Sequence, residues 1–595
     1  MKKGFIDKWK DLEGCQNLLF FAQLVSEQIF DYSIPSNRIS TLNSHYLCID
    51  ALSAIDDIVD SGVPEGTIKP IIEELYVSLE KDEAFVLSNQ SPLSLFVKQE
   101  NNGYRKIYNT KDIGFKDAQR IVNAIHQKYF SNNSYFHLLK KLIKEIVESN
   151  DIDKQDSLFK LTKSFLTELI NGGYHQQYIF DQLIYSFFNK KTDVKTPARI
   201  SRFLDAFTFN EKKFDVVFIA DKSFENVTNK YNKYIVKNQL RCRTQLEIEE
   251  TYLKKDEDYR YFVVEDVEDF DAHSAAYGIL KNFQFQASFY RLNDHNVQFD
   301  IANQKFFIYD ENDYFTIYKH NKSAVKKTKT IPFELIEKNF LKGNQAASSA
   351  FRSDFSDGRA LLNAVNFHSL SIDTISEENQ LLDLWATFET LLNISNKHTS
   401  DRIQQIVSIL VPVLKQKYLY SLFEQLSADI KNYSKDVHSS ILSVVNGQND
   451  VISIAKFVLL DSYECERNQK VSQMTDFPLL KERIMYYNQV LSTKAGVYSF
   501  VEKHSRRICW QIMRIYRNRN LIIHNGRAMP YLSLLIENLH SYVDDFIDYM
   551  INSFVQDAGK ELIYQELFAK ECEWLTRMNV KNKAIDEETI EYMLQ

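Results

Sequence analysis

The most informative stretch of the chain runs from Ile515 to Gly526 and reads Ile-Tyr-Arg-Asn-Arg-Asn-Leu-Ile-Ile-His-Asn-Gly. It includes the end of a longer segment, residues 497–524, in which apolar side chains recur at helical spacing. Asn525-Gly526, with Pro530 soon after, is a typical helix-stop signal. The pattern therefore predicts a long helix over 497–524 that ends next to His524. Its apolar stripe consists of Ile508, Ile512, Ile515 and Ile522.

Three polar residues of this helix suit phosphate chemistry. Arg519 falls on the apolar stripe, and because burying an unpaired charge is costly, it needs a partner or a function there. Asn520 and His524 are four residues apart and share a helix face. A guanidinium can fork onto phosphate oxygens, and an imidazole can move protons near neutral pH. Together they suit cleavage of RNA by its own 2′-hydroxyl, which needs no metal.

The same helix carries an unusual concentration of positive charge. Between positions 503 and 527 there are seven basic residues and no Asp or Glu, in a chain of net charge −8. This pattern predicts a local anion-binding strip on an acidic background. We expect Arg514, Arg517 and Arg527 to support phosphate binding. The seven residues, which we call the basic strip, are Lys503, Arg506, Arg507, Arg514, Arg517, Arg519 and Arg527.

The spacing of Arg519, Asn520 and His524 resembles the signature of HEPN ribonucleases, in which Arg and a following polar residue precede His by a few positions. Arg517 also fits the longer form of that spacing, but the Asn after Arg519 favours Arg519. The flanking residues of the motif resemble the Apea-like branch of that family, and so does the run Leu384 to Leu392. The resemblance extends over roughly residues 375–555.

This resemblance implies a helical bundle that forms a homodimer, so that two motifs face one groove. It implies metal-independent cleavage of RNA, with tRNA among the candidate substrates, that leaves 2′,3′-cyclic phosphate and 5′-hydroxyl ends. Arg519, Asn520 and His524 would be catalytic, and Glu389 would line the site and orient Arg519 or His524. Family members are commonly bacterial toxins or antiphage defence effectors that cause abortive infection. We therefore expect the N-terminal region to sense a phage-derived trigger.

Two alternatives remain open at this stage. The C-terminal region could be a catalytically inactive HEPN-fold module that binds RNA or protein, or a toxin restrained by a separate antitoxin. Placement of the side chains distinguishes catalysis from a structural role. A closed salt bridge between Arg519 and Glu389 inside the bundle would favour the structural role.

The rest of the chain predicts a mainly α protein with a central α/β segment and a C-terminal HEPN helical bundle. A helical N-terminal region is expected over 1–210, a mixed α/β region over 211–340, the ribonuclease domain over 341–555 and a helical tail over 556–595. A capping box, Thr374-Ile375-Ser376-Glu377, predicts a helix start. The polar stretch 464–476 is expected to be a loop. Strands are expected at 214–219, 259–264, 283–290, 297–309 and 314–318.

Composition excludes several other classes of protein. Six scattered cysteines form no zinc-ligand spacing, and no Gly-rich phosphate loop occurs. We therefore expect no cofactor and no metal. No apolar run is long enough to cross a membrane, which favours a cytoplasmic protein with no membrane contact. Asp56-Asp57-Ile58-Val59-Asp60 resembles a metal-binding acidic motif but has no second acidic motif, so we interpret it as a solvated face.

Overall fold

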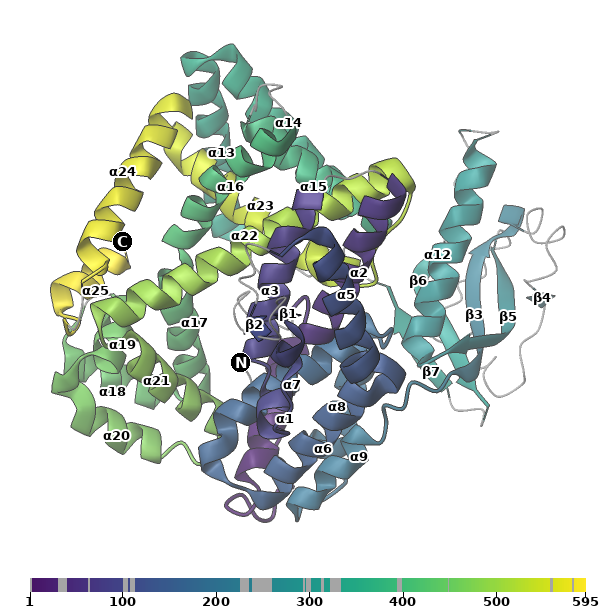
Figure 1. Ribbon diagram of the computed structural model, residues 1–595, viewed down its shortest axis with the longest axis horizontal. Helices are drawn as coiled ribbons and strands as arrows, with labels where there is room; N and C mark the ends of the chain where they lie inside the picture. Colours follow the sequence, from purple (N-terminus) through teal and green to yellow (C-terminus); the bar gives the residue numbers. More distant parts are fainter. Residues whose placement is uncertain are drawn as a thin grey trace. The chain divides into compact units, whose positions relative to one another are not determined.

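The computed structural model consists mainly of α-helices, and its described residues also form a five-stranded antiparallel sheet and a short two-stranded hairpin (Figure 1). This architecture confirms the predicted fold class, mainly α with a central α/β segment. The described residues are 3–29, 40–61, 65–99, 105–107, 113–224, 235–237, 259–292, 295, 301–311, 315–320, 333–392, 399–447, 449–556, 560–580 and 583–594.

The chain divides into two compact units. The first contains residues 1–168, 183–204 and 324–595, and the second contains residues 169–182 and 205–323. The second unit covers most of the predicted α/β region of 211–340, but it also includes residues 169–182 and 205–210, and residues 324–340 belong to the first unit. The N-terminal and C-terminal helical regions, which the sequence suggested as separate domains, lie together in the first unit.

The second unit is built on a five-stranded sheet with the order β4-β5-β3-β6-β7, in which each neighbouring pair is antiparallel. Helix α12 packs on it, with the rings of Phe218 and Phe283 5.6 Å apart. The strand predicted at 283–290 is wrong, because these residues belong to α12. The elements are β3 (Lys212–Asp221), β4 (Ile235–Lys237), β5 (Tyr259–Asp269), α12 (Ala272–Arg291), β6 (Ile301–Asp310) and β7 (Phe315–Lys319).

The N-terminal part of the chain is helical, as its apolar spacing predicts, apart from one short hairpin. Its helix α1 has no polar face in contact with solvent, because all but its first residue are buried. The elements are α1 (Gln16–Ile29), α2 (Ser44–Ser61), α3 (Lys69–Glu80), α4 (Glu83–Leu87), β1 (Val97–Gln99), β2 (Arg105–Ile107), α5 (Phe115–Ile125), α6 (Ser134–Ser149), α7 (Gln155–Asn171), α8 (Gln176–Leu183) and α9 (Ile200–Leu204).

The C-terminal half of the chain is helical wherever it is described, apart from short connections. The predicted helix start near residue 377 is confirmed, and Ser376 rather than Thr374 caps it by accepting from the Asn379 N–H at 3.2 Å. The helices are α13 (Phe333–Ser353), α14 (Phe355–Asp373), α15 (Glu377–Leu392), α16 (Thr399–Gln416), α17 (Tyr418–Tyr433), α18 (Lys435–Val445), α19 (Asp450–Leu459), α20 (Glu464–Ser472), α21 (Pro478–Leu491), α22 (Lys494–Asn525), α23 (Leu532–Val555), α24 (Lys560–Met578) and α25 (Glu587–Met593).

The loop predicted at 464–476 is wrong, because α20 occupies most of it. The buried Arg467 explains why so polar a segment folds. Its guanidinium donates to the carbonyls of Phe457 and Leu460 at 2.9 and 3.1 Å, which satisfies groups at the end of α19. Val471 adds a small apolar contact surface.

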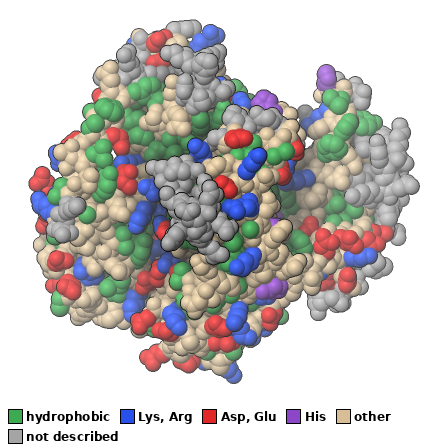
Figure 2. Space-filling model, viewed as in Figure 1, with side chains coloured by type: hydrophobic (Ala, Val, Ile, Leu, Met, Phe, Trp, Pro, Cys, Tyr) green, Lys and Arg blue, Asp and Glu red, His purple; other side chains and the backbone are tan. Residues whose placement is uncertain are grey.

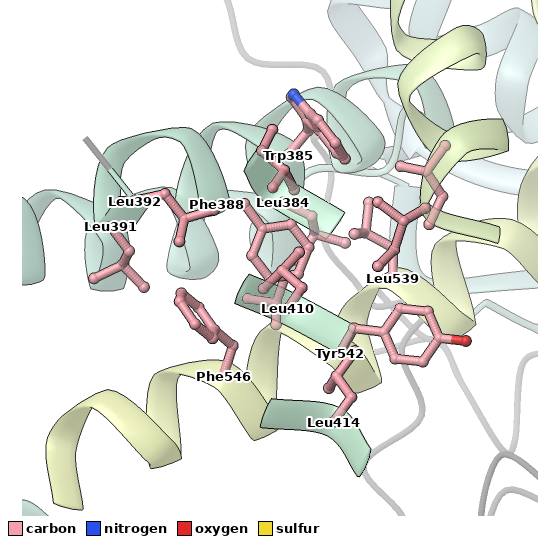
Figure 3. Close-up of a cluster of buried hydrophobic side chains, with 14 of the residues drawn as sticks. Leu384, Trp385, Phe388, Leu391, Leu392, Leu410, Leu414, Leu539, Tyr542 and Phe546 are labelled. Atoms are coloured by element: carbon pink, nitrogen blue, oxygen red, sulfur yellow. The ribbon is translucent and has the colours of Figure 1, made fainter. Parts of the chain in front are cut away.

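Helices α15, α16, α22 and α23 share one apolar core, part of which is drawn in Figure 3. Phe388 of α15 and Phe546 of α23 face each other with ring centroids 5.8 Å apart. Trp385 packs at the edge of this cluster, and its indole nitrogen points away from it. This core fixes the relative positions of α15 and α22, which carry the predicted site residues.

Helices from the two ends of the sequence join in the first unit through a buried ion pair. Arg483 of α21 donates to both carboxylate oxygens of Glu27 of α1, at 2.7 and 2.6 Å. A bidentate pair of this kind is geometrically specific, and losing one partner leaves a buried charge. The N-terminal helices are therefore integral to the unit that contains α22.

Among the described residues, one helical stretch, Arg402–Tyr433, is long and apolar enough to cross a membrane by length and composition alone. Half of its apolar window is buried inside the protein. Its residues Ile406, Leu410 and Leu414 belong to the core shared with α15 and α23. Packing in this core accounts for its apolar character.

Candidate functional site

Helix α22 begins and ends close to where the sequence predicts. The Thr493 side chain caps its N-terminus by accepting from the Gly496 N–H at 3.1 Å. Gly526 follows its last residue in the left-handed conformation, at φ 61°, and its N–H donates to Ile522 at 3.1 Å. A glycine adopts this conformation without strain, which explains why the helix ends at Asn525, one residue after His524.

Arg519 lies on α22 at the edge of the bundle, with a side chain that is 25% exposed. Its Nη1 donates to Oδ1 of Asn520 at 3.1 Å. Its Nη2 lies 3.8 Å from Oε2 of Glu389, a long contact for an ion pair. The structure therefore brings Arg519, Asn520 and Glu389 together, and Arg519 remains reachable from solvent.

Glu389 has two other partners at shorter distances. Its Oε1 accepts from the indole N–H of Trp385 at 2.8 Å and lies 3.2 Å from Nη2 of Arg402. Trp385 comes one turn before Glu389 on α15, and Arg402 comes from α16. The carboxylate is therefore held by Trp385 and Arg402 more closely than by Arg519. This arrangement is not the closed Arg519–Glu389 salt bridge that would favour a purely structural role.

Arg402, Glu389 and Arg519, which we call the Arg402–Glu389–Arg519 cluster, combine two guanidiniums with one carboxylate. Their summed formal charge is +1, so the group retains a capacity to attract an anion. The Nε of Arg402 is also buried with no hydrogen-bond partner among the described residues. Sequence reasoning missed Arg402, because nothing in its spacing connects it with the motif of α22.

His524 is exposed in the last turn of α22. It shares a helix face with Asn520, four residues earlier. Arg519 is five residues earlier, and at 3.6 residues per turn the two directions differ by roughly 140° around the axis. One copy of α22 therefore does not direct Arg519 and His524 to the same face.

Two arginines of the basic strip already form ion pairs with acidic residues of the protein. Arg514 is buried, lies 3.3 Å from Oδ2 of Asp50 and forms an ion pair with Glu74. Arg517 pairs with the other oxygen of Asp50, which also accepts from the Tyr531 hydroxyl. The prediction that Arg514 and Arg517 bind phosphate is corrected here, because acidic residues of α2 and α3 already neutralise them.

The electrostatics of this buried network are consistent with stable pairing. Burial alone would raise the pKa of Asp50, but the adjacent Arg517 and Arg514 outweigh it and lower that pKa. Burial raises the pKa of Glu74, although Arg514 opposes the shift. Two arginines face two carboxylates, so no formal charge remains to attract a ligand.

The remaining cations of the basic strip lie in a different environment. Lys503, Arg506, Arg507 and Arg527 are exposed. Arg527 lies near enough to Asp57 to counteract the rise in the Asp57 pKa that burial causes. On the face drawn in Figure 2, basic and acidic side chains are interspersed.

The acidic run at 56–60 is only partly the solvated face that we predicted. Asp56 and Asp60 are exposed, but Asp57 is buried on the side of α2 that contains Asp50. The run therefore contributes one carboxylate to the surroundings of α22.

Comparison of the chain with known proteins gives no match to a family model, a curated protein or a solved structure. The functional argument therefore depends on the residues and geometry described above.

Proposed function

We propose that this protein is a metal-independent endoribonuclease of the HEPN type, with Arg519, Asn520 and His524 as its active residues. The observation that supports this best is the Arg402–Glu389–Arg519 cluster. Arg514 and Arg517, on the same helix, are neutralised by close ion pairs with Asp50 and Glu74, whereas Arg519 shares the single carboxylate of Glu389 with Arg402 and lies 3.8 Å from it.

In the proposed reaction, the 2′-hydroxyl of a ribose attacks the adjacent phosphorus and the bond to the 5′-oxygen breaks. The hydroxyl loses a proton and the leaving oxygen gains one, so the products are a 2′,3′-cyclic phosphate and a 5′-hydroxyl. Arg519 stabilises the charge that develops on the phosphoryl oxygens. His524 transfers a proton at one of the two oxygens, and Asn520, on the same helix face, positions it.

We propose that the site forms between two copies of the chain. Arg519 and His524 leave one α22 in directions roughly 140° apart, which favours a site whose Arg and His come from different subunits. A homodimer that opposes the ends of two α22 helices supplies Arg519 from one subunit and His524 from the other. A variant that remains monomeric at micromolar concentration and still cleaves RNA would contradict this part of the proposal.

A second candidate function is a catalytically inactive module that binds RNA or protein. The hydrogen bond from Arg519 to Asn520 favours it, because a structural arginine also uses such a partner. The two functions differ in what happens to bound RNA, because only the ribonuclease cuts it. If the protein is the inactive module, it retains RNA without cutting it, and His524→Ala should leave its binding unchanged.

We further propose that the enzyme acts in the cytoplasm as an antiphage or toxin effector, with the N-terminal helices as its restraint. The pairing of Arg514 and Arg517 with Asp50 and Glu74 gives those helices direct contact with the motif helix. A trigger that displaces α2 and α3 would release two cations beside the site.

Expression of wild type and His524→Ala in bacteria tests this function directly. The wild type is expected to slow growth or limit phage multiplication, with RNA fragments that end in cyclic phosphate. The His524→Ala protein is expected to accumulate to the same level without these effects. Equal fragmentation by both proteins would overturn the assignment.

A further inference from the structure

A second group of ionisable side chains lies in the first unit, on helices other than α22. His540 and Asp544 are one turn apart on α23 and share a face. His368 comes from α14. Asp544 Oδ1 lies 2.9 Å from His368 Nε2, and Oδ2 lies 3.2 Å from His540 Nδ1. The two imidazole rings have centroids only 4.8 Å apart.

The three side chains have the spacing of metal ligands. Each can offer one ligand atom, and the three atoms lie within 4.8 Å of one another. At metal–ligand distances of about 2.0–2.2 Å in tetrahedral geometry, neighbouring ligand atoms are roughly 3.3–3.6 Å apart. The two nitrogen–oxygen contacts, at 2.9 and 3.2 Å, are slightly shorter and involve different oxygens of Asp544, so a small outward movement of the side chains makes room for an ion between them.

The burial of His540 and of the Nε2 atom of His368 supports a role as metal ligands. His540 is 2% exposed, and the Nε2 of His368, which lies beside Asp544, is buried with no hydrogen-bond partner among the described residues. Polar atoms in that position normally have a partner. Asp544 is half exposed, which leaves a route from solvent and room for a water molecule as a further ligand.

We propose that His368, His540 and Asp544 bind one first-row divalent transition-metal ion, with zinc as the first candidate. Two imidazole nitrogens and one carboxylate oxygen suit zinc and its neighbours, whereas magnesium and calcium prefer oxygen ligands alone. The ion fastens α14 to α23, the helix that follows the motif helix. This proposal replaces our expectation from the sequence that the chain binds no metal, and it does not depend on RNA cleavage.

The test uses the full-length chain, freed of metal with a chelator and then dialysed against zinc. We expect one zinc per chain by elemental analysis and a higher unfolding temperature with zinc than without it. Cobalt(II) in place of zinc is expected to give the visible absorption of a low-symmetry nitrogen–oxygen site. Asp544→Asn and His368→Gln should each lower zinc affinity by at least about tenfold.

Two matched variants serve as controls. Asp548 lies one turn beyond Asp544 on α23, is 52% exposed and pairs with Lys417, so Asp548→Asn should keep the zinc. His438 is buried and lies 3.0 Å from the Ser427 hydroxyl, so His438→Gln should keep it as well. The proposal is overturned if wild type takes up no zinc, or if folded Asp544→Asn and His368→Gln bind zinc as wild type does.

Discussion

Arg519 lies 3.8 Å from Glu389, a carboxylate that Arg402 already contacts at 3.2 Å. The relationship is unequal, because Glu389 is closer to Arg402 and to the Trp385 indole than to Arg519. A guanidinium held this loosely can exchange its carboxylate for a phosphate at small energetic cost. In contrast, Arg514 is buried and fixed between the buried carboxylate of Asp50 and the partly buried carboxylate of Glu74.

This contrast predicts that two arginine substitutions on one helix lower stability by different amounts. Arg514→Ala leaves Asp50 and Glu74 short of a buried partner and should lower the free energy of unfolding by about 3–5 kcal/mol. Arg519→Ala removes a long, partly exposed contact and should cost about 1 kcal/mol or less. Urea denaturation of both variants measures the difference. Equal losses of stability would mean that Arg519 is also structural.

Glu389→Gln should separate RNA binding from RNA cleavage. The glutamine keeps an acceptor for the Trp385 indole but removes the negative charge beside Arg402 and Arg519. RNA affinity should rise, whereas the single-turnover cleavage rate should fall about tenfold, since Arg519 loses the group that orients it. Affinity is measured with RNA that lacks the attacking 2′-hydroxyl. Weaker binding with an unchanged rate would contradict the assigned role of Glu389.

Arg402→Ala tests whether the residue that sequence reasoning missed contacts RNA. If Arg402 neutralises one phosphate, the variant should bind RNA more weakly, and the slope of log affinity against log salt concentration should fall by roughly 0.7. Salt titrations of wild type and variant measure this slope. Arg577→Ala, which alters an exposed arginine of α24 paired with Glu573, is the control and should leave the slope unchanged.

The environment of His504 predicts that the folded protein loses stability as the pH falls from about 6.5 to 5. Burial, aided by Arg507, lowers the pKa of His504 to about 3, and its ring stacks on Tyr418 with centroids 3.5 Å apart. In the unfolded chain this histidine has its usual pKa of about 6.5. Below that pH the unfolded state therefore binds a proton that the folded state does not bind, and the free energy of unfolding falls. Between about pH 6.5 and pH 5 the loss from this group should be roughly 2 kcal/mol.

His504→Phe keeps a stacked ring without a titrating group, so it should lose less stability than wild type over the same pH range. Denaturant unfolding at each pH measures both losses. His137→Phe alters an exposed histidine and should follow wild type. Identical acid sensitivity of wild type and His504→Phe would show that His504 titrates normally in the folded protein.

The sequence predicts those features that depend on neighbouring residues. The stop signal at Asn525-Gly526 predicts the end of α22 correctly, because a left-handed glycine is a local property. The strand predicted at 283–290 fails because the signal that starts α12 lies far upstream. Asp271 caps that helix by accepting from the N–H groups of His273 and Ser274. The aromatic residues of 283–290 then simply continue it.

Contacts between distant parts of the chain explain the remaining differences. Nothing near Arg514 in the sequence reveals that Asp50, 464 positions away, neutralises it. The pairing of His540 with Asp544 is visible as a four-residue spacing, but His368 joins them only in the folded chain. The sequence therefore predicts the motif of α22 and the end of its helix, but it does not predict the charged residues that lie around the motif in the folded chain.

The most direct measurement is cleavage of a 5′-labelled single-stranded RNA by the purified full-length protein in excess chelator. Wild type should cut the RNA and leave cyclic phosphate ends, while His524→Ala and Arg519→Ala, each folded, should not. An equal mixture of the two inactive variants should recover part of the activity, because a mixed dimer restores one complete Arg519–His524 pair. Cleavage by His524→Ala at the wild-type rate would contradict the central claim.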